Sequence, residues 1–159
     1  TMRVQLGERT AETVALYFAR ARQKTIQATL PQKARTVEEA LRDYRATLLP
    51  GAASYGRTIL ADGAYVGDVW CYCIDQAGTP GAMLSYCVFE PSYWSRGVAT
   101  EAVSLFLTEV KERYGLSTVG AFTFADNRAS IKVLEKNGFF LAEEFREDGR
   151  ASQYFQREL

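Results

Sequence analysis

The sequence predicts an α/β fold in which one mixed sheet is flanked by helices. Amphipathic helical patterns alternate with runs rich in aromatic and β-branched residues, and short turn signals separate these runs. One strand–helix–strand unit spans residues 83–124, and such a unit places its two strands parallel in the same sheet. The expected element order is β-α-α-β-β-β-α-β-α-β-β, which a single layered α/β structure accommodates.

The N-terminal half of the chain is predicted to contain four strands and two helices. Thr36 caps the second helix, with Glu39 three residues later as in a capping box, and Pro50-Gly51 ends it. Asp62-Gly63 indicates a hairpin turn. The expected strands are residues 3–6, 54–60, 65–75 and 83–89, and the expected helices are residues 10–23 and 36–48.

The C-terminal half begins with the clearest helix of the sequence. Apolar residues recur at helical spacing after Gly97, and Gly115 ends the helix. A strand over 118–124 follows, and Asp126 or Asn127 then caps a short helix that ends at Asn137-Gly138. Two last strands, over about 139–146 and 152–158, meet at the turn Asp148-Gly149.

One domain over residues 1–159 suits the length and apolar content of this chain. Hydrophobic residues make up 47%, so a disordered chain is not expected. A formal net charge of +0 argues against a nucleic-acid or membrane-surface partner, because either requires a basic excess. No stretch is apolar enough to span a bilayer and the N-terminus lacks a signal peptide's apolar core, so we expect a cytoplasmic protein.

The cysteine and histidine content restricts the available chemistry. Three cysteines and no histidine leave too few ligands for the common zinc sites, so we expect no metal. Cys71 and Cys73 are spaced to share one face of a strand, where buried packing is their usual role. The lack of histidine also removes His-based triads and the commonest general base.

Residues 92–102, SYWSRGVATEA, form a turn into a helix that is suited to bind phosphate. A helix N-terminus offers unpaired N–H groups and partial positive charge, and Gly97 lets a ligand approach the backbone closely. Neither a P-loop nor a GxGxxG fingerprint occurs, so a nucleoside triphosphatase or dinucleotide-binding domain is not expected. Ordinary helix initiation after a glycine is the alternative interpretation.

A second segment, DNRASIKVLEKNGF at residues 126–139, begins a helix directly after a strand. With both segments in order, the sequence resembles the GNAT superfamily of acyl-CoA-dependent N-acyltransferases, in particular its branch of ribosomal-protein N-terminal alanine acetyltransferases. The element order agrees along nearly the whole chain. The matching positions are Tyr93, Trp94, Arg96, Gly97, Ala99, Thr100, Glu101 and Ala102 in the first motif and Asn127, Ser130, Leu134, Glu135, Lys136, Gly138 and Phe139 in the second.

The resemblance implies a mostly antiparallel sheet whose central parallel strands splay apart around the pantetheine arm of acetyl-CoA. The pyrophosphate would lie on the loop 95–100, and a backbone N–H near Val88 would polarise the thioester carbonyl. Ser95 replaces the glycine usual in this branch, which predicts a slight shift of the loop. The implied cofactor-binding residues are Cys87, Val88, Phe89, Ser95, Arg96, Gly97, Val98, Ala99, Thr100, Asn127 and Ser130.

The resemblance also assigns catalytic roles. Ser130 is placed to hydrogen-bond the departing thiolate, with helix capping as its alternative role. The tyrosine that many members use for this step aligns with Leu134, so that acid is absent here. The resemblance does not identify the general base; Glu90, at a strand end beside the site, is the candidate we choose, with a solvated surface carboxylate as its alternative interpretation. Other acidic residues lie on the last hairpin, which borders the acceptor pocket in the family, and each is an alternative base or a solvated surface group: Glu143, Glu144, Glu147 and Asp148.

The predicted reaction is transfer of acetyl from acetyl-CoA to a primary amine. An α-amine of pKa about 7.8 is roughly one-seventh neutral at pH 7, whereas a lysine amine near ~10.4 is neutral in fewer than about one molecule in a thousand. A site without histidine therefore favours a peptide N-terminus or another α-amine. The alternatives are a small amine, such as a polyamine, amino-acid derivative or antibiotic, and a non-catalytic acyl-CoA-binding module. A homodimer is a further expectation.

Overall fold

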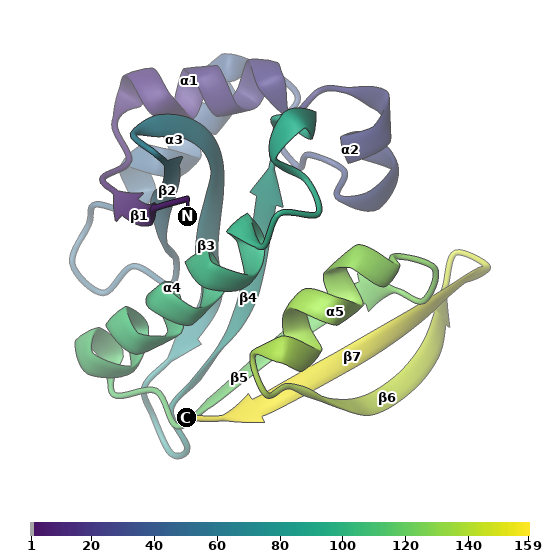
Figure 1. Cartoon of the computed structure of the whole chain (residues 1–159). Helices are drawn as coiled ribbons and strands as arrows, with labels where there is room; N and C mark the ends of the chain where they lie inside the picture. Colours follow the sequence, from purple (N-terminus) through teal and green to yellow (C-terminus); the bar gives the residue numbers. More distant parts are fainter. Residues whose placement is uncertain (1) are drawn as a thin grey trace.

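The computed structural model describes residues 2–159, which form a seven-stranded sheet with helices on both faces (Figure 1). The strands are β1 (Val4–Gly7), β2 (Tyr55–Ala61), β3 (Ala64–Asp75), β4 (Gly81–Val88), β5 (Thr118–Phe124), β6 (Phe140–Glu147) and β7 (Arg150–Glu158). The helices are α1 (Ala11–Arg20), α2 (Lys24–Thr29), α3 (Val37–Ala46), α4 (Val98–Tyr114) and α5 (Arg128–Lys136), with a 3-10 turn at Pro91–Tyr93. None of the helices in this range has the length and apolar character that crossing a membrane requires.

The strands lie in the order β1-β2-β3-β4-β5-β7-β6. Within residues 2–159, β4 and β5 pair in parallel and the other neighbours pair antiparallel. The parallel ladder joins Gly81 to Thr118, Ala82 to Val119 and Met83 to Gly120, and the two strands part beyond it. In Figure 1, β4 and β5 diverge from this shared end. The predicted mixed sheet with a splayed central parallel pair is confirmed.

Helix α4 connects the two parallel strands and buries one face in the main core. Gly97 and Gly115, with φ of +81° and +64°, mark its two ends, where a left-handed backbone favours glycine. The apolar spacing that predicts this helix from the sequence corresponds to its buried face. Its buried residues are Val98, Ala102, Val103, Phe106, Leu107 and Val110, and they belong to one cluster with Val66, Val69 and Cys71 of β3.

A smaller apolar cluster lies on the opposite face of the sheet. Ala21 and Ile26, from the α1–α2 segment, pack there with Cys87 of β4 and with Phe89, which directly follows β4. Successive residues of a strand alternate between the two faces, so β4 contributes to both clusters. Sequence neighbours on β4 therefore support α4 on one side and the α1–α2 segment on the other.

The predicted helix over residues 10–23 is wrong in one respect, because α1 ends early and a separate six-residue α2 follows. Three of the six residues of α2, KTIQAT, are β-branched, which lowers their intrinsic helix propensity. Burial of Ile26 and a hydrogen bond from the Gln27 side-chain Nε2 to the Ala21 carbonyl (2.6 Å) hold α2 in place. These tertiary contacts leave no periodic signal in the sequence.

The expected burial of both Cys71 and Cys73 is also wrong, because only Cys71 is buried and Cys73 is exposed. The backbone of Cys73 has φ of +52°, and the pairing of β3 with β4 is irregular between Tyr72 and Asp75. This irregularity breaks the alternation of side chains on which the prediction depends.

We expect Gly67→Ala to lower the free energy of unfolding by about 3 kcal/mol, at the upper end of the cost of overpacking. A Cβ at Gly67 would collide with the backbone carbonyl oxygen of Cys87, so β3 and β4 would have to move apart. Gly63→Ala is the matched control, because Gly63 has φ of +83° and no atom near its missing Cβ, so it tests backbone strain alone at about 1 kcal/mol. Urea unfolding followed by circular dichroism measures both, and equal losses would contradict the prediction.

Candidate active site

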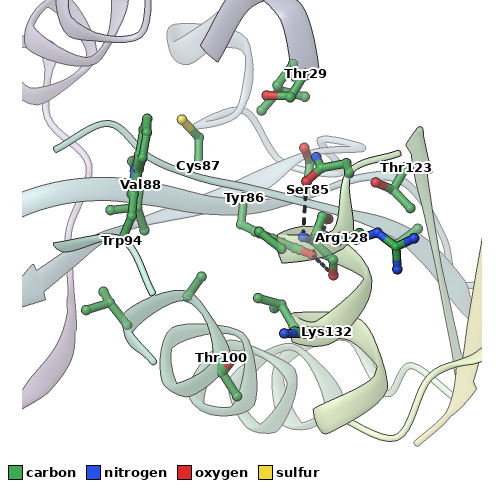
Figure 2. A pocket seen from close by; sticks show the side chains of 18 of the residues that line it. Thr29, Ser85, Tyr86, Cys87, Val88, Trp94, Thr100, Thr123, Arg128 and Lys132 are labelled. Atoms are coloured by element: carbon green, nitrogen blue, oxygen red, sulfur yellow. Dashed lines mark hydrogen bonds between the residues drawn. The ribbon is translucent and has the colours of Figure 1, made fainter. Parts of the chain in front are cut away.

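A cavity of about 750 Å³ opens where β4 and β5 part (Figure 2). Its walls come from both strands, from α2, from the first turn of α4 and from one face of α5 along its whole length. The residues of β4 that line it include Ser85 and Cys87 on one face of the sheet and Tyr86 on the other. The cavity therefore runs through the plane of the sheet and suits a long, narrow ligand.

The N-terminus of α4 is open towards this cavity. The first helical hydrogen bond runs from the Glu101 amide to the Gly97 carbonyl (3.1 Å), so the N–H groups of residues 98–100 have no acceptor within the helix. Gly97 contributes no side-chain cap. Free N–H groups at the positive end of a 17-residue helix form a site for an anion such as a phosphate.

Ser95 adopts the backbone conformation that glycine would favour at this position. Its φ is +58°, in the left-handed region that costs an L-residue about 1–2 kcal/mol. The loop therefore holds a conformation suited to glycine despite the serine side chain. Backbone strain of this kind is common beside ligand sites, where the surrounding structure maintains it.

The charged residues that line this cavity between β4 and β5, called the first cavity from here on, are all cationic. They are Arg128, Lys132 and Lys136, and no Asp or Glu of the described residues lines it. The three cations are four residues apart on α5, so they follow one face of that helix. In Figure 2, Arg128 and Lys132 extend from α5 at the cavity wall. Such a one-signed lining concentrates negatively charged ligands.

A pair of hydroxyl groups joins β4 to α5 at the inner end of the cavity. The Tyr86 hydroxyl lies 2.7 Å from Ser130 Oγ and 3.1 Å from the Ser130 carbonyl oxygen, so its single proton can be donated to either oxygen. Asn127 Oδ1 accepts from the Ser130 amide (3.2 Å) and caps the helix. Burial raises the pKa of Tyr86 above its ordinary value, so the phenol keeps its proton at neutral pH. When this proton is donated to Ser130 Oγ, the serine proton is free to point into the cavity.

The backbone of Val88 faces the gap that the parting strands leave. The neighbouring Phe89 amide donates to the Val66 carbonyl of β3 at 2.9 Å. Because N–H groups alternate in direction along an antiparallel strand, the Val88 N–H points away from β3 and towards the gap. On the same side, the Val88 carbonyl accepts a hydrogen bond from Trp94 Nε1 (2.7 Å). The Val88 N–H is therefore available to a ligand.

The structure brings most of the residues predicted to bind a cofactor into this one cavity. Those that line it are Cys87, Val88, Ser95, Gly97, Val98, Ala99, Thr100, Asn127 and Ser130. Phe89 is 0% exposed and packs behind the site, and exposed Arg96 lies over the Tyr93 ring at 5.2 Å. Glu90 precedes the 3-10 turn and lines neither this cavity nor the second one described below.

Sequence reasoning missed the cations of α5 and the partner of Ser130. The spacing of Arg128, Lys132 and Lys136 is visible in the sequence and could have indicated an anion-binding face. The pairing of Tyr86 with Ser130 had no such signal, because the contact spans 44 residues.

A second cavity, of about 730 Å³, lies between α1, α3 and β3 and meets the first at Leu30 and Ser85. Asp68, which is 2% exposed, lines it and pairs with Arg9 Nε at 3.1 Å. The Tyr65 hydroxyl donates to the other carboxylate oxygen of Asp68 (2.6 Å). Burial raises the pKa of Asp68 to about 6, although Arg9 and Tyr65 act in the opposite direction. Sequence reasoning missed this site, although a charged residue inside an apolar strand could have indicated it.

The acidic residues of the last hairpin lie apart from both cavities. Glu143, Glu144, Glu147 and Asp148 are exposed on β6 and on the turn that follows it, and they line neither cavity. The sequence-based expectation that this hairpin borders the acceptor pocket has no counterpart in the lining of these two cavities.

The parting strands, the open helix N-terminus and the cation-lined cavity between them define a GNAT-type acyltransferase fold. The chain belongs to the GNAT acetyltransferase family, because the family model described as an acetyltransferase (GNAT) domain matches residues 3–140. The matched residues include β1 to β5 and α1 to α5, and so every wall of the first cavity.

Individual relatives are more distant. The uncharacterized N-acetyltransferase YoaA of Bacillus subtilis (strain 168) is 41% identical over 49 residues, which span 31% of this chain and 28% of that protein. Among solved structures, the ribosomal L7/L12 α-N-protein acetyltransferase RimL with coenzyme A has a TM-score of 0.82 at 19% identity, covering 98% of this chain and 94% of that chain. The aminoglycoside acetyltransferase AAC(6')-Ib with coenzyme A has a TM-score of 0.79 at 13% identity, covering 99% and 95%. These similarities show a shared fold.

The raised pKa of Asp68 predicts how stability depends on pH. The native carboxyl holds its proton between its ordinary value of 3.8 and about 6, whereas the unfolded chain releases it. The contribution of Asp68 to the free energy of unfolding is therefore fully present below about pH 4 and is lost as the pH rises through about 6. We therefore expect the free energy of unfolding of the wild type to fall, relative to Asp68→Asn, by roughly 3 kcal/mol over this interval.

Urea unfolding of both proteins from pH 3.5 to pH 7 measures this difference. Asp148→Asn, at an exposed turn, is the control for the loss of one carboxylate. A wild type that gains stability over Asp68→Asn with rising pH would show instead that pairing with Arg9 outweighs burial.

Proposed function

We propose that this chain transfers an acetyl group from acetyl-CoA to a primary amine. The observation that carries the proposal is the cation-lined cavity between the parted strands, with the free N-terminus of α4 in its wall. Coenzyme A combines a pyrophosphate with a long, thin arm that ends in a thiol, and this cavity suits such a shape. Family membership and the coenzyme A bound in the RimL and AAC(6')-Ib structures support the same donor.

In this proposal, the phosphates lie at the α4 and α5 end of the cavity. The N–H groups of residues 98–100 and the loop at Ser95 hold the pyrophosphate, and Lys132 and Lys136 balance its charge. The pantetheine arm occupies the gap between β4 and β5. There it can pair with the free backbone groups of β4, as a neighbouring strand would.

Acetyl-CoA supplies the thioester from which the acetyl group is transferred. As the amine attacks, the Val88 N–H donates to the carbonyl oxygen, on which negative charge develops. A carbon–nitrogen bond forms and the carbon–sulfur bond breaks, and the Ser130 hydroxyl donates to the departing sulfur. When Tyr86 donates its single proton to Ser130 Oγ in place of the Ser130 carbonyl, the serine proton is directed at that sulfur.

Glu90 remains the proposed general base. Because its side chain lines neither cavity, it would take the proton of the amine through a water molecule. Asp68 is less suited to this role, since one carboxylate oxygen is held by Arg9 and the other by Tyr65. A base that acts only through water favours an acceptor that is already partly neutral, and an α-amine, such as a peptide N-terminus, meets this condition.

We expect coenzyme A to raise the melting temperature of the wild type, because a ligand that binds only the native state stabilises it by mass action. Gly97→Val should abolish this shift, because a β-branched residue at φ of +81° distorts the loop beneath the phosphates. Gly115→Val is the matched control, since it introduces a comparable strain at φ of +64°, at the far end of α4. A wild type that coenzyme A does not stabilise would refute the proposed function.

Loss of the Ser130 hydroxyl should slow the chemical step without weakening the binding of acetyl-CoA. We expect Ser130→Ala to lower kcat by about 10²-fold, the lower end of the range for acid–base assistance, and to leave KM for acetyl-CoA within about twofold. Tyr86→Phe should lower kcat in the same direction, and the double variant should be no slower than Ser130→Ala because Tyr86 acts through the serine.

Free-thiol release under steady-state conditions measures these effects. Tyr114→Phe, at the distant end of α4, is the control for removal of a phenolic hydroxyl. Additive losses in the double variant would assign Tyr86 a role in packing alone.

A further inference from the structure

The second cavity is placed to hold whatever the first cavity acylates. It lies on the α1–α3 side of the sheet and shares Leu30 and Ser85 with the cavity between β4 and β5. Ser85 is two residues from Cys87 and pairs in register with Trp70, which lines the second cavity. A molecule bound in the second cavity can therefore reach the parted strands at this junction without crossing the sheet.

The walls of this cavity are mainly aromatic and small apolar side chains. Tyr17 meets Trp70 edge-on with ring centroids 5.9 Å apart, and alanines of α3 and of the loop after it complete the surface. The aromatic residues of the wall are Tyr17, Phe18, Tyr44, Trp70 and Tyr72. A volume of about 730 Å³ exceeds what one amino group needs and lies within the usual range for sites that hold a small organic molecule.

The charged groups of the cavity are balanced and offer no free buried anion. Arg9 and Asp68 pair with each other, and the Arg9 guanidinium also lies over the Trp70 ring at 5.5 Å. Lys33 and Asp43, of opposite charge, are exposed at the rim. A polyamine or aminoglycoside would bring several ammonium groups into this space, and buried ammonium groups without carboxylate partners are strongly unfavourable.

We infer that the second cavity binds the body of the acceptor and that this body is apolar, so the preferred acceptor carries one primary amine beside an aromatic or large aliphatic group. The inference rests on the proposed acetyl transfer and names the class of amine within it. The amine lies at the Ser85 junction, and the apolar group fills the space between α1, α3 and β3.

An acceptor series tests the preference directly. We expect kcat/KM for phenylalanine amide to exceed that for glycinamide by at least about tenfold, because an aromatic side chain that leaves water gains binding free energy of this order. Spermidine, with several charges and no apolar group, should react no faster than glycinamide. Free-thiol release at a fixed concentration of acetyl-CoA measures kcat/KM for all three amines. A higher kcat/KM for spermidine than for phenylalanine amide, or equal values for phenylalanine amide and glycinamide, would overturn the inference.

A large side chain placed in the second cavity should remove the preference for phenylalanine amide over glycinamide without affecting acetyl-CoA. Ala46 lines the cavity yet is exposed at the end of α3, so Ala46→Trp can enter the cavity without disturbing the core. We expect this variant to raise KM for phenylalanine amide at least about fivefold and to leave KM for acetyl-CoA and for glycinamide unchanged. Arg42→Trp is the matched control, because it is exposed on the same helix and lines neither cavity. Equal effects of the two tryptophans would overturn the inference.

A binding measurement separates this inference from the proposed function. Calorimetric titration of the chain saturated with coenzyme A should detect phenylalanine amide more strongly than glycinamide, and Ala46→Trp should abolish the difference. A chain that shows this pattern but releases no thiol would support the acceptor cavity and refute acetyl transfer. A chain that is stabilised by coenzyme A and transfers acetyl to both amines equally would refute the acceptor cavity alone.

Discussion

The separation of β4 from β5 is the constraint on which the other features of this molecule depend. Backbone groups in a sheet interior need hydrogen-bond partners, yet these two strands pair only through Gly81–Met83 and Thr118–Gly120. Beyond that point, β5 continues to pair with β7 and β4 with β3, so each strand stays anchored on its outer side. The inner side is left for a ligand, for the Trp94 side chain and for the contact between Tyr86 and α5.

Electrostatics at this opening come from the distribution of charge and not from its total. The chain has a formal net charge of +0, yet three cations of α5 line the first cavity without a carboxylate among its described lining residues. The open N-terminus of α4 adds to the same field. A neutral protein can therefore bind a polyanion at one place without general affinity for nucleic acid or acidic membranes.

Unfavourable local features cluster around the two cavities. Ser95 holds a left-handed backbone at the first, and Asp68 is buried beside Arg9 at the second. Gly56 belongs to the same arrangement, because a Cβ there would collide with the Arg9 guanidinium. Packing elsewhere compensates for these costs, chiefly the cluster that joins α4 to β3.

Local signals in the sequence determined the strands, the two ends of α4 and the hairpin turns at Asp62-Gly63 and Asp148-Gly149, since each depends on residues close together in the chain. Periodicity could not predict α2, whose position depends on the burial of Ile26. Tertiary structure alone decided that Arg9 meets Asp68 across 59 residues and that Tyr86 meets Ser130 across 44. The reason is that a pattern of apolar residues states which face of an element is buried, whereas the partner of that face depends on how the whole sheet is ordered.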